Sequence, residues 1–165
     1  LKKKIAPTEL DEETKKYVHG KVHDENARAG GGITGHAGLF STTADLALLC
    51  RELLLALKGK SKKLNNGIIR NFTGRKDSPK GSSRALGWDT PSEKSSAGDL
   101  AGKKSFGHTG FTGTSIWIDP ELDLYMILLS NRVHPSRKNR KISEVRRAFA
   151  DAVITAVKKS EKKVR

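Results

Sequence analysis

The sequence of 165 residues has few cysteines, few aromatic residues and no long apolar run, and each shortage excludes a class of protein. The one cysteine, Cys50, has no partner within the chain, which excludes a small scaffold held together by disulfides. The longest apolar candidate, residues 44–57, is interrupted by Asp45, Arg51 and Glu52. A membrane helix needs roughly 18 or more apolar residues, so the sequence predicts no membrane span.

Several motifs that carry chemistry are also absent. The sequence has neither the phosphate-binding G-x-x-x-x-G-K-[ST] loop nor the G-x-S-x-G nucleophile elbow. A Ser-x-x-Lys occurs at Ser160 and Lys163, in a lysine-rich end where this spacing arises by chance, and we do not expect it to be catalytic. His19 and His23 are four residues apart, but Gly20 disfavours a helix between them and no third ligand is evident. We therefore expect no metal site and no cofactor.

Positive charge is unevenly distributed along the chain. The net charge is +14, and residues 132–165 contribute +9 of it, with 12 basic and three acidic residues. Such a segment can bind polyanions by neutralising their phosphates. It contains a single aromatic residue, Phe149, which belongs to an apolar helical face, so it lacks the aromatic side chains that stack on bases. The pattern favours a solvated helix face over a nucleic-acid site, which remains the alternative.

Hydrophobic periodicity predicts helices and strands in a definite order. A helix begins near Thr42, whose hydroxyl and the carboxylate of Asp45 resemble a capping box, and it ends near Gly59. Cys50 lies on its apolar face and is expected to be a buried apolar side chain. The strand at 124–131 is nearly all apolar and is predicted to be buried on both faces. The other expected elements are a helix at 64–72, strands at 86–89 and 115–119, and a helix at 142–157 that covers the final hairpin.

Two segments combine polar side chains with glycine-rich backbone. The first, residues 22–27, carries an imidazole, two carboxylates and an amide, and it runs into the glycine-rich stretch at 29–38. The second, residues 107–113, places His108 and Thr109 between glycines. Glycines let a ligand lie against the backbone, whose N–H groups can then donate to an oxyanion. Both segments are candidate binding sites, and plain loops are the alternative.

Residues 106–120, Phe-Gly-His-Thr-Gly-Phe-Thr-Gly-Thr-Ser-Ile-Trp-Ile-Asp-Pro, resemble the third signature of the penicillin-recognising serine hydrolases. This family includes class C β-lactamases, DD-peptidases and related esterases. Its third signature is Lys-Thr-Gly or His-Thr-Gly, on the edge strand that lines the active site. Segments at 22–27, 35–42, 86–89 and 131–136 resemble one bacterial subgroup of the family in the same order, so the resemblance spans nearly the whole chain.

The resemblance implies an α+β fold in which residues 1–165 form part of a β-lactamase-like domain. Residues 1–85 are expected to supply part of the helical subdomain, and residues 86–165 the last strands of an antiparallel sheet, packed by a C-terminal helix. The family's Ser-x-x-Lys nucleophile and Tyr-x-Asn signature normally precede these segments. Neither has a counterpart here, because neither Tyr17 nor Tyr125 is followed two residues later by Asn. The chain therefore resembles the C-terminal part of the enzyme.

The resemblance also implies roles for individual residues. In a complete enzyme of this family a serine attacks a carbonyl, and water hydrolyses the acyl-enzyme. His108 would hold a substrate carboxylate or assist proton transfer, Thr109 would offer a hydroxyl to the same group, and the Phe111 N–H would donate to the oxyanion. The residues expected to complete the substrate-binding surface are Gly110, Thr112, Gly113, His23, Asp24, Glu25 and Asn26.

A portion of a serine hydrolase is therefore the first functional hypothesis. The complete enzyme would act on a small-molecule or peptide acyl substrate, namely a β-lactam, a D-peptide or an ester, in the periplasm, outside the cell or in the cytoplasm of a bacterium. This chain alone would be inactive and would need the missing N-terminal part, whose absence leaves an unpaired strand edge that favours association. The alternatives are a basic module that binds polyanions or nucleic acid through residues 132–165, and a scaffold with no activity of its own.

Overall fold

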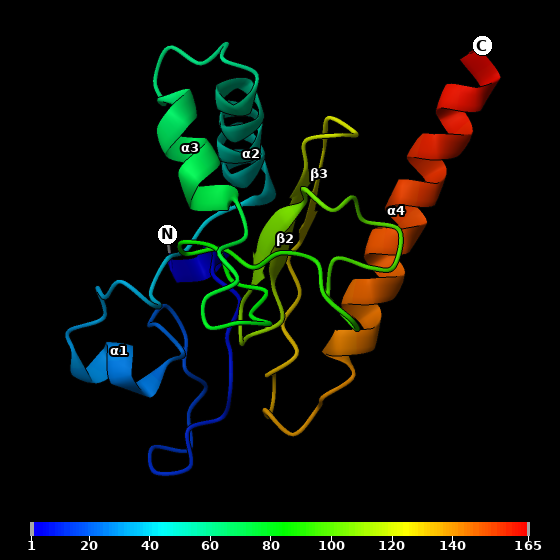
Figure 1. Ribbon diagram of the computed structural model, residues 1–165. Helices are drawn as coiled ribbons and strands as arrows, with labels where there is room; N and C mark the ends of the chain where they lie inside the picture. Colours follow the sequence, from blue (N-terminus) through cyan, green and yellow to red (C-terminus); the bar gives the residue numbers. More distant parts are fainter. Residues whose placement is uncertain (1, 165) are drawn as a thin grey trace.

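The computed structural model of the protein describes residues 2–164, with side chains through Ser160 (Figure 1). Its elements, in chain order, are the 3-10 helix η1 (Lys2–Lys4), the helices α1 (Glu25–Ala29), α2 (Thr43–Leu57) and α3 (Asn66–Thr73), the strands β1 (Phe106–Thr109), β2 (Ser115–Asp119) and β3 (Leu124–Leu128), and the helix α4 (Ile142–Val164). The sheet lies between α2 with α3 on one side and α4 on the other. This arrangement confirms the expected α+β fold class.

The sheet is antiparallel throughout, with the strand order β1-β2-β3. Strand β2 has the predicted bounds, and Ile118 on it pairs with Tyr125 on β3. Strand β3 ends at Leu128, earlier than predicted. The prediction that this strand is buried on both faces is wrong: Met126 is buried, but Tyr125 is 37% exposed. The reason is that β3 is an outer strand with a neighbour on one side only among the described residues.

Alternation along β2 divides the hydrophobic core between the two helical layers. One face of the sheet, which includes Ile118, packs on α2 around Cys50. The opposite face, which includes Trp117, packs on α4 around Ala150 and Ile154. Cys50 is fully buried, as predicted, and burial raises the pKa of its thiol to about 11. The sheet is therefore a central layer with a separate apolar cluster on each face.

Local hydrogen bonds explain where α2 begins and ends. The Thr42 hydroxyl accepts the N–H of Asp45 at 3.2 Å and donates to its carboxylate at 3.0 Å. Past the last turn, Gly59 has a φ of +71° and donates its N–H to the Ala56 carbonyl at 2.9 Å. A glycine reaches this left-handed conformation without steric cost and ends the helix. The predicted helix from Thr42 to Gly59 is confirmed.

The segment predicted to be a strand at 86–89 differs in the structure. It forms only isolated bridges, in which Asp89 pairs with Arg84 and with Gly107 of β1. Gly87 has a φ of +78°, so the chain turns between Arg84 and Asp89 and cannot continue as an extended strand. The second helix, by contrast, is present close to its predicted position.

Helix α4 begins at the predicted residue and covers the sheet. Arg146, Ala150 and Ile154, spaced by four residues, form its most buried stripe, whereas Val145 is 48% exposed. Phe149 and Val153 of the predicted apolar face border this stripe and are partly buried against the same cluster. Within residues 2–164, no helix is both long enough and apolar enough to span a membrane.

Truncation of the fully buried Ile154 tests this packing. We expect Ile154→Ala to lower the free energy of unfolding by about 2–5 kcal/mol, because it leaves a cavity beside Trp117. Val145→Ala on the same helix is the control and should change it by about 0.5 kcal/mol or less, since Val145 is half exposed. Urea denaturation followed by circular dichroism measures both, and equal losses would contradict the assignment of the buried stripe.

Candidate functional site

Strand β1 is the other outer strand of the sheet, and it carries the His-Thr-Gly segment on its free edge. Gly107 exchanges two backbone hydrogen bonds with Asp89, at 2.9 and 2.7 Å. A side chain at Gly107 would collide with the Trp117 ring and the Ile116 carbonyl, so this position requires glycine. The last two residues of β1 have no strand partner on their outer edge among the described residues, which leaves room for an extended ligand.

The partners of His108 define the state of its ring. Its Nε2 lies 3.0 Å from Nη1 of Arg84, and its Nδ1 lies 2.9 Å from the Thr109 carbonyl oxygen. A guanidinium only donates hydrogen bonds and a carbonyl only accepts them. Both contacts are satisfied when the imidazole is neutral and carries its proton on Nδ1. Sequence reasoning missed Arg84, which places a permanent positive charge beside His108.

His108 and Thr109 point to opposite faces of the sheet. His108 pairs with Ile116, which packs on the α2 side, whereas Thr109 pairs with Ser115 and lines a pocket beside α4. Neighbouring residues of a strand alternate in this way. Although the two residues are adjacent in β1, their side chains therefore have different surroundings: His108 lies beside Arg84, and Thr109 lies beside the arginines that line the pocket.

The turn after β1 is held by backbone hydrogen bonds. The Gly113 N–H donates to the Gly110 carbonyl at 3.1 Å, and the Thr112 carbonyl accepts the Arg132 N–H at 2.8 Å. Gly113 has a φ of +121°, which favours glycine. Thr112 and Gly113 thus brace the turn. The Phe111 N–H has no acceptor among the described residues, so it is free to donate to an oxyanion.

The Phe111 ring contacts the side chains of His23 and Arg132. It stacks on the His23 imidazole, with a centroid separation of 5.6 Å and an interplanar angle of 21°. The Arg132 guanidinium lies 4.2 Å from the ring centroid on a cation–π contact, and its Nε donates to the Phe111 carbonyl at 2.8 Å. These contacts fix the backbone of Phe111 although 58% of the residue is exposed.

A cluster of charged side chains near Phe111 holds the His23 imidazole in place. His23 Nε2 contacts the Glu9 carboxylate at 2.9 Å, and Arg137 pairs with both Glu9 and Glu25. The hydrogen bond from Arg137, with a further one from His23, lowers the pKa of Glu9 to about 2. Hydrogen bonding to Arg137 also lowers the pKa of Glu25. Two of the predicted rim residues, His23 and Glu25, therefore contribute to this bracing cluster.

The remaining two predicted rim residues have other roles. Asp24 accepts the Ala27 N–H at 2.8 Å as the N-cap of α1 and contacts His36 at 3.0 Å, and these hydrogen bonds lower the pKa of the Asp24 carboxyl. Asn26 is exposed on α1 and makes no side-chain hydrogen bond among the described residues. Asp24 thus caps α1, and neither residue makes a hydrogen bond or a stacking contact with Phe111 among the described residues.

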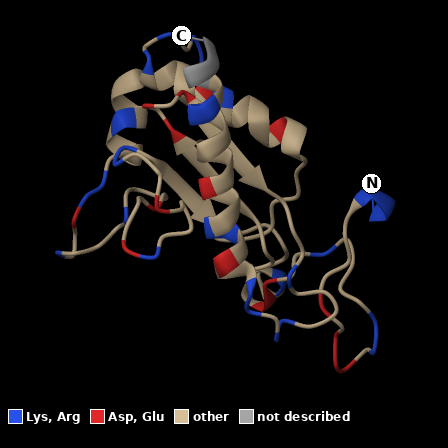
Figure 2. Cartoon of the chain, turned by 90° about the vertical axis from the view of Figure 1, so that its right-hand side faces the viewer, with Lys and Arg blue, Asp and Glu red and all other residues tan. Residues whose placement is uncertain are grey.

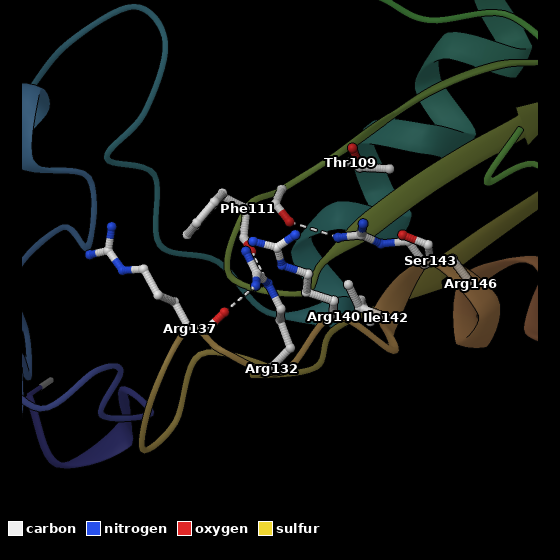
Figure 3. Close-up of a pocket in the computed structure, with 9 residues that line it drawn as sticks. Thr109, Phe111, Arg132, Arg137, Arg140, Ile142, Ser143 and Arg146 are labelled. Carbon is white, nitrogen blue, oxygen red and sulfur yellow. Dashed lines mark hydrogen bonds between the residues drawn. The ribbon is translucent and has the colours of Figure 1, made fainter.

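A pocket of about 470 Å³ opens beside the turn, between β1 and the start of α4 (Figure 3). Its walls come from the end of β1 and the following turn, from the loop that precedes α4, and from the first turns of α4. The lining residues are Thr109, Gly110, Phe111, Arg132, Arg137, Arg140, Ile142, Ser143 and Arg146.

The sequence predicts that residues 132–165, which include the four arginines of this pocket, form a solvated helix face. The run of positive charge was a valid signal, but charge alone does not show that a loop folds these residues around one cavity. Figure 2 shows basic residues spread along α4 and the loops around it, interspersed with acidic ones, and not gathered on a single continuous face.

Cys50 and Ser160 make no hydrogen bond to a basic side chain among the described residues. Cys50 is buried, and the Ser160 hydroxyl donates to the Val157 carbonyl at 2.8 Å within α4, whereas the side chain of Lys163 lies outside the described residues. No serine or threonine hydroxyl bonds to the side chain of a histidine or lysine in the described part of the chain. His19 contacts the Ile5 carbonyl, and no cluster of metal-binding side chains occurs among residues 2–160.

Comparison with known proteins identifies the family to which the chain belongs. Residues 4–150 match the family model described as Beta-lactamase. The chain belongs to the beta-lactamase family. This confirms the resemblance to the penicillin-recognising serine hydrolases, since a β-lactamase-type fold and an edge-strand His-Thr-Gly segment occur together here.

The relatives of this beta-lactamase family member are longer than the chain. Putative D-alanyl-D-alanine carboxypeptidases of Salmonella typhi and Salmonella gallinarum are each 37% identical over 155 residues, which cover 84% of this chain and 35% of theirs. The chain thus spans about a third of the length of the curated relatives it matches. A beta-lactamase structure from Mycobacterium bovis aligns with a TM-score of 0.61 and 22% identity, covering 73% of this chain and 46% of that one, and shows the shared fold.

The bracing cluster generates a prediction about acid stability. The pKa of Glu9 is lowered on folding, so its contribution to stability is present above about pH 4.5 and is lost as the pH falls towards 2. Hydrogen bonds to charged groups are each worth about 1.5–3 kcal/mol. Glu9→Gln should therefore flatten the decline of unfolding free energy between these pH values, as measured by urea denaturation. Glu12→Gln, at an exposed glutamate of the same loop, is the control, and a steep decline that survives Glu9→Gln would contradict the prediction.

The contact with Arg84 predicts a measurable state of the His108 ring. The ¹⁵N chemical shifts of the imidazole should report a neutral ring with its proton on Nδ1 in the wild-type chain near neutral pH. Arg84→Met removes the donor to Nε2 and leaves only the Thr109 carbonyl to favour the proton on Nδ1, so the tautomer with its proton on Nε2 should gain population. Arg51→Met, on the exposed side of α2, should leave the shifts unchanged. A ring that keeps one tautomer in Arg84→Met would show that Arg84 does not set it.

Proposed function

We propose that this chain is the substrate-binding portion of a serine acyl hydrolase and that it does not catalyse acyl transfer alone. The observation that carries the proposal is the free Phe111 N–H at the end of the edge strand β1, with His108 and Thr109 just before it. Membership of the beta-lactamase family and the likeness to putative D-alanyl-D-alanine carboxypeptidases support a D-peptide substrate with a free carboxylate. Residues 1–165 would then be one part of a larger domain.

In the complete enzyme the reaction would run in two steps. A serine Oγ attacks the substrate carbonyl, the C–N bond breaks, and the amine leaves with a proton. Water then attacks the acyl-serine, which releases the acid and restores the serine hydroxyl. The serine, and the base that takes its proton, would come from outside the described residues.

The contribution of this chain to that reaction would be electrostatic and geometric. The Phe111 N–H would donate to the carbonyl oxygen as negative charge develops on it, as one half of an oxyanion hole. The stacking on His23 and the contact with Arg132 keep this N–H fixed before substrate arrives. A fixed donor needs no reorganisation during the reaction, and the loss of one donor typically costs about 10²–10³ in rate.

A chimera tests the proposal directly. The part of the Salmonella typhi relative that precedes its matched region would be fused to this chain, and release of D-alanine from a D-alanyl-D-alanine peptide would be measured. We expect Phe111→Pro, which deletes the N–H, to lower kcat by about 10²–10³. Phe111→Ala keeps the N–H and should cost less than about tenfold.

Folding of each chimera is checked by circular dichroism, so that a loss of rate is not confused with a loss of structure. A folded chimera that releases no D-alanine would contradict the proposed activity. A folded Phe111→Pro chimera with nearly unchanged kcat would contradict the oxyanion role of this residue.

A further inference from the structure

Positive charge that the proposed function does not use is concentrated around α3. Residues 58–80 contribute +7 to the net charge of +14, with eight basic residues and one acidic residue, Asp77. The basic residues are Lys58, Lys60, Lys62, Lys63, Arg70, Arg75, Lys76 and Lys80. Of these, Lys58 alone pairs with a carboxylate among the described residues, that of Asp123. This segment therefore presents a strong positive charge that the described chain leaves almost unneutralised.

Helix α3 exposes two large apolar side chains in the middle of this charge. Ile68 is 58% exposed, and Phe72, four residues later, is 45% exposed. Residues four apart lie on one face of a helix, and the opposite face of α3 packs on the core through Ile69. Leu86, which is 42% exposed, adjoins Phe72 because its N–H donates to the Phe72 carbonyl at 3.1 Å. The three exposed side chains thus form an apolar stripe that no described residue covers.

Basic side chains stand at both ends of this stripe. Lys60, Lys62 and Lys63 are exposed in the loop before α3 and make no side-chain hydrogen bond among the described residues. Lys76 follows the end of α3, and its Nζ donates to Asn71 on the helix at 2.7 Å. Figure 1 shows α3 beside α2, on the side of the sheet away from α4. We call the apolar stripe together with the basic residues of 58–80 the α3 surface.

The α3 surface combines the two features that an anionic lipid bilayer recognises. Basic side chains are attracted to anionic headgroups, and apolar side chains of a surface helix enter the boundary between headgroups and acyl chains. Nucleic acid would match the charge, but it binds by stacking on aromatic side chains, and Phe72 is the single aromatic residue of 58–80. A second copy of the chain would bring the same positive charge against the surface. The bilayer is the partner that matches both the lysines and the apolar stripe.

We propose that the α3 surface docks this protein on a membrane that contains anionic lipids. The contact is peripheral, because the eight residues of α3 are too few to cross a bilayer. The surface is joined to the candidate site, since the Lys76 N–H donates to the Arg84 carbonyl at 3.1 Å and Arg84 contacts His108. Docking therefore holds the His108 end of β1 near the membrane. The proposal does not rest on the proposed function.

Vesicle binding by the 165-residue chain tests the docking. Vesicles of phosphatidylglycerol and phosphatidylcholine in equal parts are the anionic probe, and vesicles of phosphatidylcholine alone are the neutral match. Co-sedimentation gives the two partition coefficients. We expect at least about tenfold stronger binding to the anionic vesicles. Raising sodium chloride from about 0.1 M to about 0.5 M should weaken this binding at least about tenfold, because salt screens exposed charges.

Two triple variants of equal net charge separate the α3 surface from positive charge in general. The first replaces three lysines beside α3 and carries Lys60→Gln, Lys62→Gln and Lys63→Gln. The control replaces three exposed lysines of the N-terminal segment and carries Lys15→Gln, Lys16→Gln and Lys21→Gln. The first should weaken binding to anionic vesicles at least about tenfold and the control less than about threefold. Equal losses would show that net charge alone drives binding and would overturn the proposal.

Single substitutions test whether the apolar stripe enters the bilayer. Ile68→Ser and Phe72→Ser should each weaken binding to anionic vesicles at least about fivefold, because each removes apolar surface that the lipid covers. Val145→Ser is the control, since Val145 is 48% exposed on α4 on the other side of the sheet, and it should change binding less than about twofold. Circular dichroism shows that each variant folds.

Two further outcomes would overturn the proposal by assigning the surface to another partner. Binding that depends on the lysines but is unchanged in both Ile68→Ser and Phe72→Ser would show a general polyanion surface, as for nucleic acid. A chain that sediments as a dimer without vesicles, and as a monomer in Phe72→Ser, would show that a second copy covers the stripe.

Discussion

Two hydrogen bonds from one buried guanidinium hold the candidate site together. Arg146, on the second turn of α4, donates to the carbonyls of Gly110 and Thr114 and so fastens both ends of the turn that follows β1. The free N–H of Phe111 lies within this turn, and the arginine pocket lies against it. The packing of α4 on the sheet thereby determines where the free N–H of Phe111 and the arginine-lined pocket lie relative to each other.

A second constraint comes from the opposite end of the sequence. The Asn131 side chain donates to the Pro7 carbonyl at 2.6 Å, and the Leu10 N–H donates to the Pro135 carbonyl at 3.0 Å, so the N-terminal segment is attached to the loop before α4. This attachment brings Glu9 within reach of Arg137 and places His23 under the Phe111 ring. Segments with little regular structure are thus held in place by hydrogen bonds and an ion pair, and the rim of the site depends on contacts distant in sequence.

The sequence predicted the elements that depend on local chemistry and missed what depends on distant partners. The limits of α2 and β2 follow from a cap, a glycine and simple alternation, all within a few residues. The strand expected at 86–89 fails because a positive φ at Gly87 turns the chain. Arg84 and Arg146 act on groups 24 and 36 residues away, so no spacing rule reveals them. His108 was predicted from the motif, but its partner and its tautomer required the fold.

The central claim is that this chain carries the edge of a serine hydrolase site but not its nucleophile. Incubation of the folded 165-residue chain with a fluorescent penicillin, followed by intact-mass spectrometry, tests this most directly. The account predicts that the mass stays that of the unmodified chain, because no described hydroxyl is activated by a histidine or lysine. A stoichiometric penicilloyl adduct on one serine, formed by the folded chain and absent after denaturation, would contradict it.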